Sequence, residues 1–208
     1  KIDAVLHFAG FKSVTESVEK PIRYYTNNLS ATFVLCQVMA EFKVKRLVFS
    51  SSCTVYGIPL SVPVDENAAL NPCNPYGQTK LIIEKFFRDL SQADSSWEII
   101  LLRYFNPIGA HSSGLIGEEP LGVPNHLLPY ISQVAIRRLS VFSIFGNDYS
   151  TPDGTCIRDY IHVVDLVKGH IAALEHIFGG SKGGGNKTVA LNLGTGRGYS
   201  VLEVLQAF

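Results

Sequence analysis

Short apolar runs alternate with longer segments of helical periodicity along the first half of the chain. The runs at 2–8, 44–50 and 99–105 are β-branched or apolar throughout most of their length, which predicts buried strands. Between them, 22–42 and 76–90 repeat apolar residues at three-to-four spacing, which predicts helices. Strands that are separated by helices indicate parallel β-α-β units covered on both faces. The pattern therefore predicts an α/β fold built on a doubly wound parallel sheet.

The pattern changes after Pro107, where glycine and proline become frequent. Further elements are predicted as a helix at 127–138, a strand at 141–145, a helix at 163–178, a strand at 189–193 and a helix capped by Ser200. We divide the chain into a sheet domain at 1–106, the start of a smaller lobe at 107–160, and a return helix, strand and truncated final part at 161–208. The first strand begins at residue 1 and the last helix is still running at Phe208, so we expect sequence to be missing at both ends, including the N-terminal part of the sheet domain.

Composition narrows the classes of protein. Of 208 residues, 46% are apolar and 17% charged, which is typical of a folded chain rather than a disordered one. The formal net charge is zero, so the sequence lacks the basic excess of a nucleic-acid binder or a polybasic membrane anchor. No apolar run is long enough to span a bilayer. Four scattered cysteines and six histidines match no disulfide framework or metal-ligand spacing, so we predict a reducing cytoplasm and no metal.

Candidate chemistry gathers at the ends of the predicted strands. In a doubly wound sheet, ligands bind beyond the carboxyl ends of the strands, which places Gly10, Ser52 and Asn106 at one edge. Tyr76 and Lys80 lie four residues apart on one helix face, so the ammonium can favour the phenolate. Free tyrosine has a pKa of about 10, and a base that works near neutrality needs a value roughly 3 units lower. A serine hydroxyl at the same edge could hold a substrate alcohol while Tyr76 takes its proton.

Longer motifs run almost from end to end. They include HFAGFKSVTESVEKP at 7–21, SSSCTVYG at 50–57, NPYGQTK at 74–80, LLRYFNPIGAH at 101–111 and FGNDYSTPDGTCIRDYIHVVDL at 145–166. With these motifs the chain resembles the extended branch of the short-chain dehydrogenase/reductase superfamily, and within it the UDP-glucose 4-epimerase family. The resemblance implies a Rossmann-like NAD-binding domain that lacks its N-terminal part, followed by part of a substrate-binding lobe. It also implies a cytoplasmic homodimer that uses NAD and interconverts UDP-glucose and UDP-galactose at carbon 4, through a 4-keto sugar, in galactose metabolism.

The same resemblance assigns roles to individual residues. Tyr76 would be the catalytic base, Lys80 would lower its pKa and bind the nicotinamide ribose, and Ser52 would assist at the sugar hydroxyl. The cofactor-binding positions would be Phe8, Ala9, Gly10, Lys12, Asn27, Ser50, Ser51, Tyr76, Lys80, Tyr104 and Phe105. The substrate-binding positions would be Lys12, Ser52, Cys53, Thr54, Tyr104, Asn106, Asn125, His126, Leu127, Ser143, Ile144, Phe145 and Arg158.

The chain departs from the family pattern at three places. The family's glycine-rich dinucleotide turn would precede Lys1, and the run GTGRG at 194–198, which imitates it, is expected to be a structural turn. Cys53 stands where relatives commonly carry alanine, which we interpret as a packing change. His126 replaces a frequent asparagine and could alter a hydrogen bond at the nucleotide end of the substrate.

Two other functions remain open. One is a nucleotide-sugar 4,6-dehydratase or decarboxylase of the same superfamily. Dehydratases of this branch usually carry acidic residues directly after the serine position, whereas this chain has Cys53 and Thr54. The other is a truncated, non-catalytic binding domain without the pyrophosphate-binding turn. Cofactor titration of the 208-residue chain would separate the second alternative from an enzyme.

Overall fold

The computed structural model describes residues 1–120, 122, 124, 126–179 and 188–208. The chain forms two compact units, the first made of Lys1–Tyr104 with Lys168–Leu193, and the second of Phe105–Val167 with Gly194–Phe208. The predicted last segment, 161–208, is therefore shared between the units, because its strand extends the sheet of the first while its final residues join the second.

The first unit contains a four-stranded parallel sheet. Its strands are β1 (Val5–His7), β2 (Arg46–Ser52), β3 (Glu98–Tyr104) and β6 (Thr188–Leu193), in the order β1-β2-β3-β6. Every neighbouring pair is parallel. The predicted fold class, an α/β fold with a parallel sheet, is confirmed.

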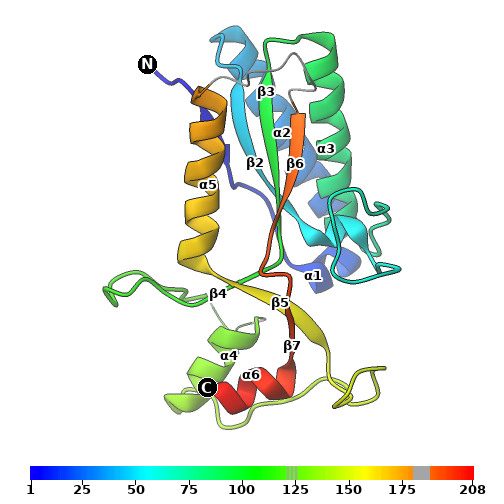
Figure 1. Ribbon diagram of the computed structural model, residues 1–208, viewed down its shortest axis with the longest axis vertical. Coiled ribbons are helices and arrows are strands. Elements are labelled where there is room, and N and C mark those ends of the chain that lie inside the picture. Colours follow the sequence, from blue (N-terminus) through cyan, green and yellow to red (C-terminus); the bar gives the residue numbers. More distant parts are fainter. Residues whose placement is uncertain (121, 123, 125, 180–187) are drawn as a thin grey trace. The chain divides into compact units, whose positions relative to one another are not determined.

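Helices cover both faces of this sheet (Figure 1). On one face, α2 (Pro21–Glu41) and α3 (Pro75–Ala93) pack on Leu47, Phe49, Ile99 and Leu101. On the other, α5 (Val163–Phe178) packs on Val48, Ile100 and Leu102. Successive strand residues point to opposite faces, so each continuous apolar run supplies two cores, at about 1.5–3 kcal/mol for each fully buried large side chain. Within the described ranges, none of the helices combines the length and apolar content that crossing a membrane requires.

Two short helices complete the first unit beside the strand ends. The helix α1 (Val14–Glu19) follows β1 and is capped by Ser13, whose hydroxyl accepts the Glu16 N–H. The 3-10 helix η1 (Cys53–Tyr56) continues directly from β2, and Ser52 caps it by accepting the Thr54 N–H at 3.2 Å. Neither short helix was predicted, because each is too brief to show a periodic pattern.

The second unit is built around a small three-stranded sheet. Its strand β5 (Ile157–His162) pairs in parallel with β4 (Asn106–Ile108) and antiparallel with β7 (Gly198–Ser200). The helices are α4 (Leu127–Ala135) and α6 (Val201–Ala207). The predicted cap at Ser200 is confirmed as a complete capping box, in which Ser200 and Glu203 satisfy each other's backbone N–H groups.

The strand predicted at 141–145 is wrong. This segment has no regular secondary structure, and its contacts go to α4 instead of to a strand. The ring of Phe142 packs edge-on against Tyr130, at 5.6 Å between centroids, and the Tyr130 hydroxyl donates to the Val141 carbonyl at 3.4 Å. A β-branched run forms a strand only where another strand supplies hydrogen bonds, and that requirement is not visible in a local pattern.

Candidate active site

The start of α3 is fixed directly beside the end of β2. Asn74 caps the helix by accepting the Gly77 N–H at 2.8 Å, and Pro75 occupies the first helical position. A side chain at Gly77 would meet the Thr54 carbonyl oxygen and the Pro72 Cβ, each at 2.9 Å. The glycine therefore allows the first turn of α3 to approach η1 closely, which brings Tyr76 to the strand end.

Ser52, Tyr76 and Lys80 meet at the carboxyl edge of the sheet. Ser52 at the end of β2 forms a side-chain hydrogen bond with Tyr76. The Lys80 ammonium lies 5.8 Å from the centroid of the Tyr76 ring and 4.7 Å from that of Phe49. It donates to the Ser50 carbonyl oxygen at 2.6 Å. The structure thus brings together the three residues that the sequence nominated for catalysis.

Burial controls the protonation of this group. It raises the pKa of Tyr76 to about 12, an effect that the Ser52 hydrogen bond opposes. Burial also lowers the pKa of Lys80 to about 8, against the attraction of the Glu84 carboxylate. In the protein alone Tyr76 is therefore a neutral phenol at pH 7, and the phenolate expected from the sequence requires Lys80 together with a further positive charge, such as that of a cationic nicotinamide ring.

The turn after β1, predicted to contact a cofactor, is held by Asn28 of α2. The Asn28 side chain accepts the Phe11 N–H at 2.8 Å and donates to the Phe11 carbonyl at 3.1 Å. It also donates to Thr79 on α3 at 3.1 Å, and the neighbouring Asn27 amide donates to it at 3.0 Å. Phe8, Ala9, Gly10 and Lys12 lie exposed on this turn. Asn28 was not nominated, although it is the buried residue that connects the turn to the catalytic helix.

Tyr104 lies at the end of β3 and faces the same edge. Its hydroxyl is hydrogen-bonded to the His170 ring on α5, and its side chain also hydrogen-bonds Ser50. Phe8 also packs against His170, with 5.1 Å between the centroids of the two rings. Burial raises the pKa of Tyr104 to about 12, so this phenol is neutral at pH 7. His170 is a second residue that the sequence patterns did not single out.

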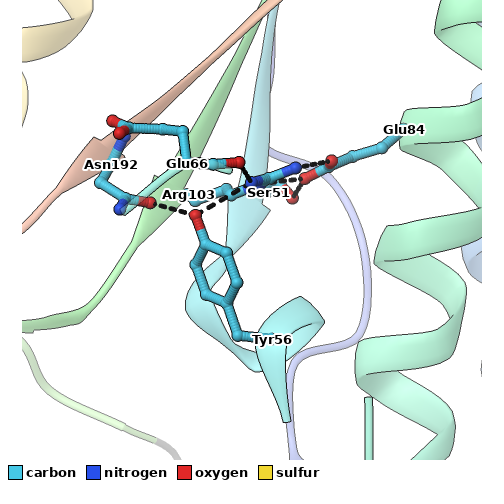
Figure 2. A network of polar contacts seen from close by, with 6 residues as sticks. All are labelled: Ser51, Tyr56, Glu66, Glu84, Arg103 and Asn192. Carbon is cyan, nitrogen blue, oxygen red and sulfur yellow. Dashed lines mark hydrogen bonds and ion pairs between the residues drawn. The ribbon is translucent and has the colours of Figure 1, made fainter. Parts of the chain in front are cut away.

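Ser51 faces away from its serine neighbours. Its hydroxyl donates to the Glu84 carboxylate at 2.5 Å, on the side of the sheet that α3 covers. Glu84 is ion-paired with Arg103, and both side chains are buried (Figure 2). Two signals could have revealed this pair: Glu84 continues the four-residue spacing of Tyr76 and Lys80, and Arg103 interrupts an otherwise apolar predicted strand.

The remaining predicted site residues lie in the second unit. Phe105 directly precedes β4, Asn106 is its first residue, and His126 precedes α4, which starts at Leu127. His126 faces the Glu118 carboxylate at 3.3 Å. Ser143, Ile144 and Phe145 are exposed, as is Arg158 on β5. Asn125 lies outside the described residues.

The GTGRG turn is satisfied by the chain itself. The Asp159 carboxylate accepts the N–H groups of Thr195 and Gly196 at 2.8–2.9 Å, and the Thr195 hydroxyl at 2.8 Å. Backbone amides that could cradle a phosphate are thus used by an internal carboxylate. This arrangement agrees with the structural role expected from the sequence.

Comparison with known proteins finds relatives that match the chain along its whole length. A UDP-glucose 4-epimerase of Bacillus subtilis (strain 168) is 56% identical over 208 residues, which are 100% of this chain and 60% of that protein. The crystal structure of UDP-glucose 4-epimerase from Bifidobacterium longum in complex with NAD+ and UDP has 55% identity and a TM-score of 0.93, over 99% of this chain and 60% of that one. The enzyme from Stenotrophomonas maltophila, with bound NAD and formylated UDP-arabinopyranose, has 48% identity and a TM-score of 0.92, over the same shares of 99% and 60%.

The chain thus spans about 60% of the length of the relatives it matches. A family model described as the NAD dependent epimerase/dehydratase family matches residues 1–194. That range contains β1 to β6 and the Ser52, Tyr76 and Lys80 side chains, and of the second unit's sheet it includes β4 and β5 but not β7. The chain belongs to the NAD dependent epimerase/dehydratase family.

Proposed function

We propose that this chain carries the catalytic centre of an NAD-dependent isomerase that interconverts UDP-glucose and UDP-galactose at carbon 4, through a 4-keto sugar. The observation that carries the proposal is the meeting of Ser52, Tyr76 and Lys80 at the carboxyl edge of a parallel sheet. The names of the relatives, which are UDP-glucose 4-epimerases, support the choice of substrate.

The donor set of this edge fits a nicotinamide nucleotide. An ammonium has three N–H donors, and Lys80 gives one to the Ser50 carbonyl, so it can also hold ribose hydroxyls. Phe8, Ala9, Gly10, Lys12, Asn27, Ser50, Tyr104 and Phe105 are the other positions that we propose to hold it. Ser51 is the exception, because its hydroxyl already serves Glu84. When bound, the oxidised nicotinamide supplies a positively charged and reversible two-electron acceptor.

The chain's own residues move the proton. Ser52 is placed to hold the sugar 4-hydroxyl, and Tyr76 takes its proton as the alcohol is oxidised to a ketone. After the keto sugar presents its other face, Tyr76 would return the proton to the carbonyl oxygen, and reduction of carbon 4 from that face by the hydride equivalent taken up in the first step would invert the carbon with no net oxidation. Since burial holds the pKa of Tyr76 at about 12 in the protein alone, the base forms only when cationic groups collect beside it.

One buried hydroxyl at this edge is available for a substrate. Thr54 Oγ1 is the buried side-chain oxygen that has no hydrogen-bond partner among the described residues. An unsatisfied buried hydroxyl costs about 1–3 kcal/mol, which a sugar hydroxyl could relieve. We propose Lys12, Cys53, Thr54 and Tyr104 as the first unit's substrate-binding positions. The second unit would add Asn106, Asn125, His126, Leu127, Ser143, Ile144, Phe145 and Arg158, whose guanidinium suits a diphosphate.

Replacing Tyr76 by phenylalanine tests the proposal. In the protein that carries this chain, Tyr76→Phe is expected to reduce UDP-galactose turnover by roughly 100-fold or more, because general-base catalysis is lost. UDP binding, measured by calorimetry, is expected to change little. Tyr25→Phe, the same change at an α2 residue outside the proposed sites, is the matched control. Full turnover by the Tyr76 variant would refute the assigned role.

The dehydratase alternative gains nothing from the structure. Cys53 and Thr54 form the first residues of η1, where a dehydratase would need an acid and a base. A 4,6-dehydratase would release a 4-keto-6-deoxy sugar, which mass spectrometry of the products distinguishes from an epimer.

We further propose that the protein works as a cytoplasmic homodimer. The buried face of α2 is formed by Tyr24, Asn28, Thr32, Cys36 and Met39. Its other face leaves Ile22, Val34 and Val38 exposed, at 82%, 57% and 46%. Exposed apolar stripes of this kind are commonly covered by a partner. Sedimentation of Val34→Glu should yield monomers if α2 forms the contact, and unchanged dimers would exclude this helix.

A further inference from the structure

A buried ion pair lies directly behind the candidate active site. Glu84 on α3 is 0% exposed and Arg103 on β3 is 1% exposed. The Arg103 Nη2 and Nε atoms donate to the two Glu84 oxygens at 2.7 and 3.0 Å, so the pair is bidentate. Figure 2 shows the two side chains end to end at the centre of a larger polar network.

The pair connects the strand end that carries Ser52 to the helix that carries Tyr76. The Glu84 carboxylate accepts the Ser51 hydroxyl at 2.5 Å. On either side of Ser51, the Ser50 carbonyl holds the Lys80 ammonium and the Ser52 side chain holds Tyr76. A displacement of Ser51 would therefore move the partners of both catalytic side chains.

Arg103 extends the network to two further segments. Its Nη1 atom donates to the Tyr56 hydroxyl at 2.9 Å and to the Glu66 carbonyl at 3.2 Å. Tyr56 in turn donates to Asn192 on β6 at 2.7 Å, and the Asn192 N–H donates to the Glu66 carboxylate at 2.7 Å (Figure 2). Five elements, β2, η1, α3, β3 and β6, are thus tied together by side chains of fixed geometry.

A contribution to stability does not by itself explain why this ion pair is buried here. Taking two charges out of water costs about as much as their attraction returns, and apolar pairs of similar volume are often more stable. The surrounding core of Phe49, Phe87 and Leu101 shows that apolar packing is available at neighbouring positions. What apolar residues would not supply is a directional link to the Ser51 hydroxyl.

We propose that Glu84 and Arg103 are positioning residues, which set the register of the Ser50–Ser52 strand end against α3 and so hold Ser52, Tyr76 and Lys80 in their reactive arrangement. This inference rests on the proposed function. It adds residues that touch neither sugar nor cofactor and act through Ser51.

The pair also acts on Lys80 through its charge. The Glu84 carboxylate raises the pKa of Lys80, against the larger lowering by burial. With the carboxylate neutralised and the Arg103 guanidinium retained, the ammonium would lose its proton at a lower pH. The alkaline limb of the pH profile of turnover, where Lys80 must stay charged, would then move to lower pH.

Glu84→Gln in the protein that carries this chain is the main test. We expect kcat to fall by roughly 10- to 100-fold, the scale for small displacements of reacting groups, with KM for UDP-galactose little changed and the alkaline limb displaced to lower pH. Asp94→Asn is the matched control, because Asp94 pairs with Lys45 at 2.6 Å on the surface, outside the site. Its kcat and pH profile should equal those of the wild type.

Hydrogen exchange provides a readout that does not depend on turnover. Glu84→Gln should speed exchange of the amides of Ser51, Ser52 and Thr54, while Asp94→Asn should not. A lowered Tm with wild-type kcat, pH profile and amide exchange would show a merely structural pair and overturn the inference. If the wild type has no epimerase activity, the proposed function fails, and the exchange result still decides whether the pair holds the strand end.

The double variant Glu84→Gln with Arg103→Gln covers the case in which the single variant does not fold. It removes the unpaired buried guanidinium, which is the main destabilising element of the single variant. We expect a folded protein whose kcat remains below that of the wild type and whose strand-end amides exchange faster. Wild-type values for both would overturn the inference.

Discussion

The strands of the parallel sheet bury different kinds of side chain in their first halves and towards their carboxyl ends. In their first halves, β2 and β3 contribute Leu47, Phe49, Ile99 and Leu101, which form an apolar core with α2 and α3. Towards the carboxyl ends, the same strands bury Ser51 and Arg103, and α3 buries Glu84 and Lys80. The change takes place within single strands, over a distance of two or three residues.

The apolar half of the strands mainly stabilises the fold, whereas the polar half mainly holds the groups proposed for catalysis. In the apolar half, each side chain contributes through area removed from water, which needs no specific partner. In the polar half, each group needs its partner at hydrogen-bonding distance, because an unpaired buried charge is costly. We therefore expect substitutions in the apolar half to change the free energy of unfolding, and those in the polar half to change catalysis.

Lys80→Met should give the largest separation between the effect on catalysis and the effect on stability. Turnover is expected to fall by roughly 100-fold or more, since the ammonium that supports Tyr76 is lost. Burial lowers the pKa of Lys80 from 10.5 to about 8. The unfolded chain therefore binds more protons between pH 8 and 10.5, so the free energy of unfolding of the wild type rises as pH increases through this window. Thermal unfolding at pH 7 should show a variant no less stable than the wild type, without that rise at alkaline pH. A large loss of Tm would contradict this view.

Phe87→Ala should show the opposite behaviour. Phe87 is fully buried in the apolar half, packed against Phe49 at 5.2 Å between ring centroids. Truncation should cost about 3–5 kcal/mol in denaturant unfolding, with the turnover of the folded fraction nearly unchanged. Phe42→Ala, at a residue that is 71% exposed, is the control and should cost less than about 1 kcal/mol. Equal losses from both variants would remove the distinction between buried and exposed apolar sites.

His7 provides a smaller test at the boundary between the halves. Burial, followed by the nearby Lys80 charge, lowers its pKa from 6.5 to about 4, and its ring bonds Thr32 at 2.9 Å. The unfolded chain therefore binds more protons between pH 4 and 6.5, and stability must fall as pH decreases through this window. The loss is at most about 3 kcal/mol. His7→Gln should flatten the curve in that range, and an unaltered slope would assign it to other groups.

The fold was largely readable because its signals are local. Each strand of the first sheet is a short apolar run, and each covering helix has repeated apolar positions, so the parallel α/β arrangement follows from their alternation. Spacing on one helix face paired Tyr76 with Lys80, and the end of the preceding strand placed a serine at the same edge. The choice of Ser52 and the three catalytic roles came from the family resemblance. The strands of the second sheet were missed, since β4 and β7 are three residues long and depend on β5 for their hydrogen bonds.

The sequence by itself determined the layers of the fold and the residue types at the edge of the sheet, because periodicity and turn chemistry act over a few residues. Only the tertiary structure decided which serine faces which partner, that Glu84 and Arg103 share one buried contact, and that Tyr76 keeps its proton in the protein alone. Those properties depend on burial and on distances between segments far apart in the chain, and no local pattern contains them.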